Sequence, residues 1–311
     1  MVDYKKGLHK IGDCTYAYLQ PDGSWGWSNA GFVSDGSNSI LVDTLFDLKL
    51  TREMLDEISQ KVKGAEKIDT LVITHANGDH VYGNELVKGA EIIASKACAE
   101  EMTETPPQML AEMMKAAPTL GDIGRYFTHC FSEFNFDGIT LTFPTNTFEG
   151  RMDLTVGSKE VNLIEVGPCH TKGDVIVFVP YDRTVFAGDM LFIGGTPIMW
   201  IGPVKNWIQA CDLMLDMEAD IFVPGHGPIT DKKGVDSIKA YWHYIEAEAR
   251  KRYDDGMNAE DAAFDIDLGP YGSWGEKERI VINVAALFKE FKGDDIPLNA
   301  VELFGLMARM A

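Results

Sequence analysis

Residue types that bind metal ions stand close together in the segment Leu71–Asn84, which reads LVITHANGDHVYGN. The apolar residues at its start indicate a short buried strand, and the glycines after them indicate a loop. That loop carries His75, Asp79 and His80 within six residues. Imidazole and carboxylate groups at the end of a buried strand suit a divalent transition metal, because the strand end holds them rigidly. The alternative is a polar turn whose two histidines are solvated.

Three further segments have the same pattern, in which an apolar run ends at a residue type that binds metals. They are Val161–Val166 before His170, Thr184–Ala187 before Asp189, and Ile221–Val223 before His226. Four of the seven histidines therefore follow predicted strands, each close to a glycine. Chance would rarely arrange them so, and the pattern favours one metal site assembled from several strand ends.

The order of the motifs along the chain supports the same interpretation. The segments are ILVDT at residues 40–44, HANGDH at 75–80, GPCHTKGD at 167–174, FAGDM at 186–190 and VPGHGP at 223–228. This order resembles that of the metallo-β-lactamase superfamily, and the resemblance covers roughly residues 10–230. It implies an α/β fold, the four-layer αβ/βα sandwich of that superfamily. The resemblance is specific to the fold and only weakly specific to the substrate.

The resemblance also implies a set of metal ligands. Carried over residue by residue, a first site would be formed by His75, Asn77 and His170. A second site would be formed by Asp79, His80 and His226, with Asp189 between the two metals. Asp43, at the end of the upstream strand, would support the metal-binding loop as a hydrogen-bond acceptor and would not bind the metal.

One residue departs from the family pattern, because Asn77 stands where the family has a histidine. An amide oxygen is a neutral and weaker ligand for zinc than an imidazole. We therefore expect the second site to be the obligate one and the first to bind metal less tightly. One or two Zn²⁺ ions are expected, with iron or manganese as alternatives.

Such a site would do hydrolytic chemistry. A metal with an open coordination position lowers the pKa of bound water toward about 7. The resulting hydroxide would attack a small ester, lactone, thioester or related electrophile, and the metal would stabilise the developing oxyanion. Asp79 is the expected catalytic residue, sharing proton handling with that water. Two alternatives stay open: a redox di-iron protein of the same fold, and a catalytically weak metal-binding or sensor protein.

Two tryptophans near the N-terminus are candidates for substrate binding. Trp25 and Trp27 follow Pro21-Asp22-Gly23, which is typical of a turn between two strands. In the family, a hairpin near the N-terminus often overhangs the metals, so both rings are expected to contact substrate. The alternative is that they pack on the body of the protein.

The segment that follows Asp189 is expected to form part of the pocket rim. There, Trp200 is a further candidate contact, and Lys205 could hold a substrate carboxylate, unless it is simply solvated ahead of a helix. Asn206 is expected to cap that helix, over residues 207–217. A helical insertion at about residues 103–137 is rich in methionine and aromatic residues, which either line an apolar pocket or bury the insertion against the domain.

Length and composition restrict the remaining possibilities. A chain of 311 residues is long enough for one large α/β domain. We expect a catalytic domain over residues 1–230 and a C-terminal helical extension over 231–311, packed on the same domain and a candidate for homodimer contacts. Helices are expected at 51–62, 233–253, 258–264, 276–292 and 299–310.

Charge and cysteine content bear on partners and location. The net charge of −20 argues against binding nucleic acid and favours a small-molecule substrate. No segment resembles a signal peptide or a membrane span. Five scattered cysteines suit a reducing compartment, so the cytoplasm is the expected location.

Overall fold

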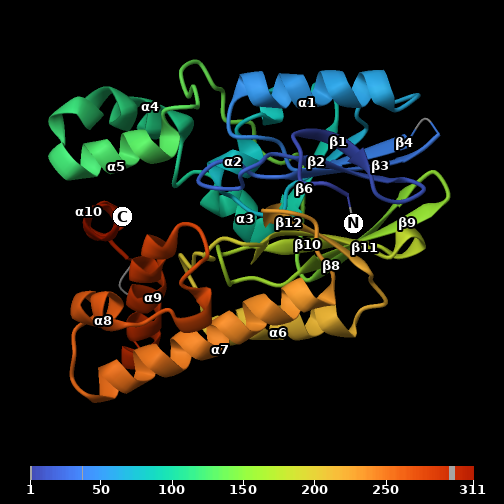
Figure 1. Ribbon diagram of the computed structural model, residues 1–311. Helices are drawn as coiled ribbons and strands as arrows, with labels where there is room; N and C mark the ends of the chain where they lie inside the picture. Colours follow the sequence, from blue (N-terminus) through green and yellow to red (C-terminus); the bar gives the residue numbers. More distant parts are fainter. Residues whose placement is uncertain (1, 37, 294–297) are drawn as a thin grey trace.

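The computed structural model describes residues 2–36, 38–293 and 298–311. Two β-sheets lie face to face in the middle of the molecule (Figure 1). In spatial order, the first sheet contains β1 (Gly7–Lys10), β2 (Thr15–Leu19), β3 (Ala30–Asp35), β4 (Asn38–Val42), β5 (Thr70–Val72), β6 (Glu91–Ser95) and β7 (Asn146–Phe148). Strands β1 to β4 pair antiparallel, whereas β4 to β7 pair parallel.

The second sheet is mostly antiparallel. In spatial order it contains β12 (Ile221–His226), β11 (Thr184–Phe192), β10 (Val175–Val179), β9 (Lys159–Glu165) and β8 (Arg151–Val156). Only β11 and β12 pair parallel within these described strands. Every residue of β11 is buried, so this strand lies in the interior and can present a polar side chain away from solvent.

Aliphatic side chains from both sheets fill the space between them. Val33, Ile40 and Val72 of the first sheet and Val177 and Phe186 of the second belong to one buried cluster. The residues that alternate with them, such as Phe32 and Leu41, are also buried but belong to a second cluster, so both faces of these strands are covered.

Helices cover the outer faces of the two sheets. Helix α1 (Leu48–Lys61) lies outside the first sheet, and α6 (Val204–Asp216) and α7 (Lys232–Asp254) lie outside the second (Figure 1). The inner face of α1 buries Leu50, Met54 and Ile58, which are four residues apart and share one face of the helix. The predicted four-layer αβ/βα sandwich is therefore confirmed.

The insertion packs on the body of the protein through aromatic rings. It follows α3 (Lys96–Glu101) and contains α4 (Pro107–Ala116) and α5 (Gly121–Phe131). Phe131, Phe134 and Phe136 are buried, and their ring centroids lie 5.8, 4.9 and 4.9 Å from that of Phe46, which precedes α1. Of the two alternatives for this aromatic stripe, the structure favours burial of the insertion against the domain.

The C-terminal extension consists of helices, as predicted. After α7 come α8 (Ala259–Asp265), a short 3₁₀ turn (Lys277–Arg279), α9 (Ile280–Lys292) and α10 (Ala300–Met310). Trp242 of α7 packs on Trp207 of α6 with ring centroids 4.6 Å apart, and both belong to the main buried cluster. The division into a catalytic domain and an extension stays a prediction.

The prediction for the start of α6 was wrong. The helix begins at Val204 after Pro203, and Asn206 lies inside its first turn, where its side chain donates a hydrogen bond to the Pro168 carbonyl at 3.0 Å. Proline is well suited to a helix start, because its fixed φ and missing N–H cost nothing there.

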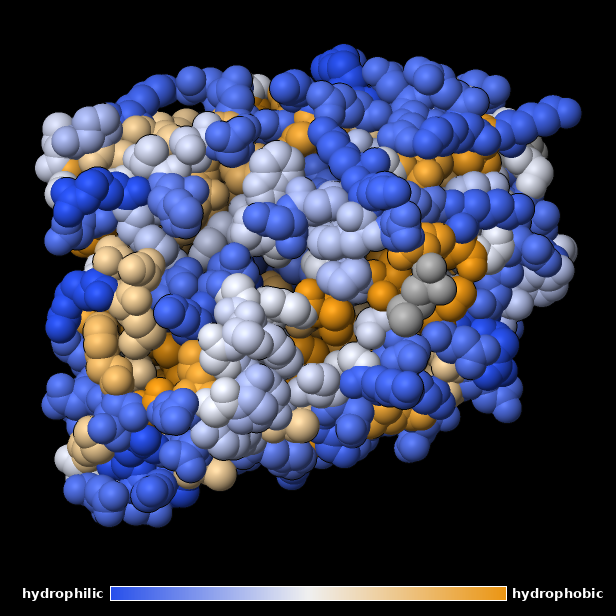
Figure 2. All heavy atoms as spheres, viewed as in Figure 1, coloured by the Kyte–Doolittle hydropathy of each residue, from blue (hydrophilic) through white to orange (hydrophobic). Residues whose placement is uncertain are grey.

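The molecular surface is largely hydrophilic in the view of Figure 2, with apolar side chains at its left, over α10 and the insertion. Val301 on α10 is 61% exposed and Met109 on α4 is 42% exposed. The homodimer contact expected for the C-terminal helices stays a prediction. Among the described residues, helices that combine the length and the apolar character needed to cross a bilayer do not occur.

Candidate metal centre

The candidate ligands from both sheets meet in one place, at or near the ends of their strands. His75 follows β5, and the four-residue helix α2 (Gly78–Val81) carries Asp79 and His80. Asp189 lies within β11, and His226 ends β12. The neighbour of Asp189 on β12 is Gly225, where an added Cβ would collide with the Asp189 carboxylate, so glycine is required for the two strands to approach.

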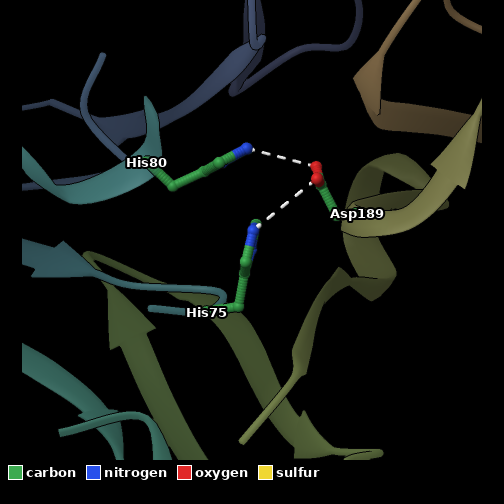
Figure 3. Close-up of side chains that lie close together, drawn as sticks. All are labelled: His75, His80 and Asp189. Atoms are coloured by element: carbon green, nitrogen blue, oxygen red, sulfur yellow. Dashed lines mark ion pairs between the residues drawn. The ribbon is translucent and has the colours of Figure 1, made fainter. Parts of the chain in front are cut away.

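Asp189 is at the centre of the cluster. Its carboxylate oxygens lie 3.1 Å from His80 Nε2 and 3.7 Å from His75 Nε2, and Figure 3 shows both rings pointing toward it. The Nε2 atoms of His170 and His226 are 3.3 and 3.5 Å from the same carboxylate. Long-range folding therefore brings together residues more than a hundred positions apart.

Asp79 lies beside this group, on the side of His226. Its Oδ2 atom is 3.3 Å from His226 Nε2 and 3.9 Å from His80 Nε2. The Asp79 side chain is 13% exposed, whereas the side chains of the other ligand candidates above are at most 5% exposed. Asp79 is thus the member of the cluster most open to an incoming molecule.

Hydrogen bonds fix the orientation of the imidazole rings. Nδ1 of His80 is 2.9 Å from Asp43 Oδ2, and Nδ1 of His75 is 3.0 Å from Thr74 Oγ1. Nδ1 of His170 faces the Ile198 carbonyl at 2.6 Å, and Nδ1 of His226 faces the Gly23 carbonyl at 3.1 Å. With Nδ1 held in this way, each ring directs Nε2 toward the centre, as metal-binding histidines do.

Asp43 supports the loop as expected. Its two carboxylate oxygens accept hydrogen bonds from the backbone N–H and the hydroxyl of Thr74, both at 2.7 Å, in addition to the contact with His80. Asp43 has φ of 66°, a conformation that aspartate and asparagine adopt more readily than most residues. The predicted role of Asp43 as a hydrogen-bond acceptor is confirmed.

The donor set fits a transition metal. His75 Nε2, His80 Nε2 and Asp189 Oδ1 are buried and form no well-oriented hydrogen bond among the described residues, although His80 Nε2 and Asp189 Oδ1 lie 3.1 Å apart. Buried polar atoms are normally satisfied, so three unsatisfied atoms in one place call for a ligand. Two groups have all their ligand atoms within 4.8 Å of one another: His75, His80 and Asp189, and Asp79, His80 and His226. Imidazole with carboxylate is a common combination at zinc and iron sites.

Burial and the neighbouring charges have opposite effects on the pKa of Asp189 and of His80. Burial alone would raise the pKa of Asp189, but the nearby His226, His80 and His75 hold it well below its usual value. Burial lowers the pKa of His75, and the neighbouring His80 lowers it further. His80 is also buried, yet Asp189, Asp79 and Asp43 raise its pKa well above the ordinary value. The Asp189 carboxylate is thus stabilised in its charged form by the histidines around it, as expected for a metal ligand.

Asn77 takes up a different position from that of a metal ligand. Its amide nitrogen lies 3.0 Å from His170 Nε2. Because Nδ1 of His170 donates to the Ile198 carbonyl, Nε2 is the acceptor, and the Asn77 N–H donates to it. The Asn77 oxygen would have to turn toward the centre to bind a metal, which adds to the reasons for expecting a weak first site.

The residues around His170 are structural. The Asp174 carboxylate accepts hydrogen bonds from the backbone N–H groups of Cys169 and Thr171, at 3.0 and 3.0–3.1 Å, and so closes the loop. Burial raises the pKa of Asp174 to about 8. Burial also raises the pKa of the Cys169 thiol, which argues against a nucleophilic thiolate there.

The two predicted substrate-binding tryptophans contact the insertion and the C-terminal extension. The ring of Trp25 lies 5.9 Å from Phe131 of α5 and 5.7 Å from Phe304 of α10. The ring of Trp27 lies 4.8 Å from Phe134. Both rings are partly exposed, so a substrate contact stays a prediction for each of them.

The other two candidate substrate contacts, Trp200 and Lys205, differ in their surroundings. Trp200 is half-buried, and its backbone N–H donates to the His170 carbonyl at 3.1 Å, so it lies next to the centre. Lys205 is exposed in the first turn of α6 and forms no hydrogen bond or ion pair within the described part of the chain. A role for Lys205 in holding a carboxylate stays a prediction.

Sequence reasoning missed Arg279 and Glu278, which lie against Trp25. They fall in the segment GSWGEKERI, which was interpreted as part of a loop and a helix. No motif marks them, and only their contacts in the folded chain reveal their place near the centre.

Comparison with known proteins agrees with this fold. The family model described as the metallo-β-lactamase superfamily matches residues 23–226. The chain belongs to this superfamily, whose members are metal-dependent hydrolases that typically bind zinc.

Several proteins of known name are similar over different parts of the chain. A type 2 metallo-β-lactamase from a Bacillus species is 25% identical over 212 residues, covering 66% of this chain and 68% of the relative. The α subunit of 2,4-dinitroanisole O-demethylase from a Nocardioides species is 30% identical over 88 residues, or 26% of each protein. These relatives are named for different reactions.

Solved structures extend the likeness of the fold. A metallo-β-lactamase from Pontibacter korlensis matches with a TM-score of 0.58 and 20% identity, covering 77% of this chain and 99% of that one. The inverting sec-alkylsulfatase Pisa1 from a Pseudomonas species matches with a TM-score of 0.67 and 16% identity, covering 96% of this chain. The chain spans about half of the alkylsulfatase, 53% of its length.

Proposed function

We propose that the protein is a metal-dependent hydrolase that cleaves a small ester, lactone, thioester or related electrophile. The observation that carries the proposal is the convergence of His75 Nε2, His80 Nε2 and Asp189 Oδ1, which are buried and unsatisfied. The family match supports hydrolysis, but the relatives' names include a lactamase, an O-demethylase subunit and an alkylsulfatase. The relatives therefore do not identify the bond that is cleaved, and the ester, lactone or thioester bond is part of this proposal.

The residues of the centre would have different roles in metal binding and in proton transfer. A divalent cation bound there supplies a water of lowered pKa and a positive charge for the developing oxyanion. In the obligate site, Asp79, His80 and His226 would hold the cation together with Asp189, and the Nδ1 partners of the two histidines would keep their rings in place. Asp79, the most exposed ligand candidate, would accept a proton from the attacking water at Oδ2 and return it to the leaving group.

The proposed cofactor is zinc, with iron or manganese as alternatives. The position of the Asn77 amide supports one tightly held ion, because its nitrogen faces His170 and its oxygen is a weak ligand. The group of Asp79, His80 and His226 is complete and would be the obligate site, with Asp189 shared.

The proposed substrate is a small neutral or charged molecule in the cytoplasm. The acidic chain, at a net charge of −20, does not suit a nucleic acid. All five cysteines are free and buried, which is the expected state in a reducing compartment.

One experiment tests the proposal. The protein is stripped of metal, reloaded separately with zinc, manganese and iron(II), and assayed against esters, lactones and thioesters. We expect at least one metal to restore turnover, and we expect Asp189→Asn to reduce both metal binding and turnover by at least about 100-fold, more than a typical loss of an outer-shell partner. Asp212→Asn, a change of the same kind at an exposed ion pair with Lys239, should alter neither. Inactivity of every loaded form on the whole panel would overturn the proposal.

A further inference from the structure

Arg279 is a buried arginine without a partner charge. It is 1% exposed and lies in the short turn before α9. The other arginine with a buried side chain, Arg252, forms ion pairs with Glu248 and Asp265 at 2.6 and 2.8 Å. Arg279 forms no ion pair with any carboxylate in the described ranges. A buried guanidinium is costly unless it is paired, so this one calls for an explanation.

The contacts of Arg279 leave part of the guanidinium edge unused. Nη1 donates to the Thr196 carbonyl at 3.0 Å, whereas Nε has no hydrogen-bond partner among the described residues. Cζ lies 4.3 Å from the ring centroid of Trp25 and 5.4 Å from that of Phe192. Aromatic rings attract the cation but do not accept its in-plane N–H groups. The Nε edge therefore has no acceptor, although it is shielded from solvent in this conformation.

Arg279 is connected to the metal centre through the ring of Phe192. Phe192, which it contacts, stacks on the His226 ring with centroids 5.0 Å apart and planes 2° from parallel. Gly275, four residues before Arg279, pairs with Gly195 in the loop that follows β11. A single aromatic ring thus lies between the guanidinium and a candidate metal ligand. Residue 279 lies outside the residues 23–226 that the family model matches.

Two carboxylates near Arg279, those of Glu276 and Glu278, would repel an anion bound there, but neither pairs with the guanidinium. Glu278 accepts hydrogen bonds from the Tyr126 hydroxyl at 2.8 Å and from the Trp25 indole N–H at 3.5 Å. Burial raises the pKa of Glu276, whereas the nearby Arg279 lowers it. Neither carboxylate forms an ion pair with Arg279, so neither occupies the free edge.

We propose that Arg279 binds a carboxylate or similar oxyanion of the substrate, at a distance from the bond that is cleaved. The guanidinium suits such a group, because Nε and the adjacent nitrogen form a fork that matches two oxygens. Trp25 covers Arg279, so its loop must move to admit the ligand. This proposal rests on the proposed function and narrows it to acidic substrates, such as an ester or thioester with a free carboxylate at its other end.

Paired probes of equal shape test the proposal without catalysis. Binding of benzoate and of benzamide to the metal-loaded protein is measured by calorimetry and by the shift in Tm. We expect the wild type to bind benzoate and to bind benzamide much more weakly. In Arg279→Gln, benzoate binding should weaken by about 10- to 100-fold, the loss expected for a charged hydrogen-bond pair. Benzoate bound directly to the metal would be equal in both proteins, so the difference reports on Arg279.

The control is Arg250→Gln, which removes an exposed arginine whose Cζ lies 3.6 Å from the ring centroid of Phe291. It should leave benzoate binding unchanged. In turnover, Arg279→Gln should raise KM for a 4-nitrophenyl ester with a terminal carboxylate while leaving KM for the neutral ester unchanged. A merely structural role would lower Tm and affect both esters equally, which would overturn the proposal.

Two further outcomes decide the matter. Equal binding of benzoate and benzamide by the wild type would overturn the proposal, even if the glutamine variant does not fold. Arg279→Lys keeps the charge but loses the fork, and it should show intermediate affinity. Should the loaded enzyme hydrolyse nothing while benzoate binding depends on Arg279, the oxyanion site stands and the proposed hydrolysis alone fails.

Discussion

Replacing Asp43 by asparagine tests whether this buried carboxylate holds the metal centre in place. The change keeps the size and shape of the side chain. It also keeps the backbone, because asparagine is as suitable as aspartate at the observed φ of 66°. Only the charge and one acceptor are lost, so the effect can be assigned to the hydrogen bonds of Asp43.

The cost follows from the geometry. Oδ1 accepts from the Thr74 N–H and Oδ2 accepts from the Thr74 hydroxyl, while His80 Nδ1 also faces Oδ2. An amide NH₂ in either position would face a donor, so at least one charged hydrogen bond is lost and one buried donor is left unsatisfied. We expect the free energy of unfolding to fall by about 2–4 kcal/mol.

The same change should loosen the metal site. The Thr74 hydroxyl also lies 3.0 Å from His75 Nδ1, so Asp43 orients His80 directly and His75 through Thr74. Loss of an outer-shell partner typically costs about 10- to 100-fold in metal affinity. The assay combines urea denaturation with competition against a chelator for zinc.

Asp47→Asn is the matched control. Asp47 is also a buried aspartate, at 3% exposed, but it caps α1 and does not contact the centre. We expect this variant to lose stability and to keep the metal affinity of the wild type. The reasoning is refuted if Asp43→Asn binds zinc as tightly as the wild type, or if Asp47→Asn weakens zinc binding to the same extent.

Three other predictions follow from the site and its surroundings. In a zinc titration we expect the wild type to bind one equivalent tightly and a second more weakly, and Asn77→His to bind two tightly; two equally tight equivalents in the wild type would contradict the role given to Asn77. Replacing Trp25 and Trp27 by alanine should lower Tm, because both rings pack on the insertion, and should raise KM; an unchanged KM would leave them a packing role only. Asp182 has a lowered pKa, because hydrogen bonds from Cys14 and Thr15 outweigh the effect of burial. The contribution of Asp182 to stability is present above its unfolded pKa of 3.8 and is lost as pH falls through the folded pKa. In urea denaturation, the difference in stability between the wild type and Asp182→Asn should therefore become smaller below about pH 4.

Local sequence patterns were sufficient to predict the strands and most of the ligand-bearing turns, but Asp189, which was expected to follow a strand, lies inside β11. Each apolar run before His75, His170, Asp189 and His226 is a strand of the structure, or ends within a few residues of one. Apolar runs and glycine-rich turns are local properties, so they are visible in the chain without its fold. The order of the motifs also predicted the layered architecture and the Asp43 support, and the helical stretches after His226 predicted the extension.

Tertiary structure decided which atoms meet. The carbonyls that hold His170 and His226 belong to Ile198 and Gly23, which no motif identifies. The contact of the Asn77 amide with His170 depends on two loops ninety-three residues apart, and the burial of Trp25 depends on helices from both the insertion and the extension.

Arg279 shows the same limit most clearly. Its sequence neighbours indicate only a loop and a helix, whereas in the structure it lies beside Phe192, and Gly275 near it pairs with Gly195. Contacts of this kind depend on how separate elements pack, and packing is specified by the whole chain acting together. The sequence by itself therefore determined the family, the ligand types and their strands, while the folded chain alone determined how those ligands are held and which charge lies beside them.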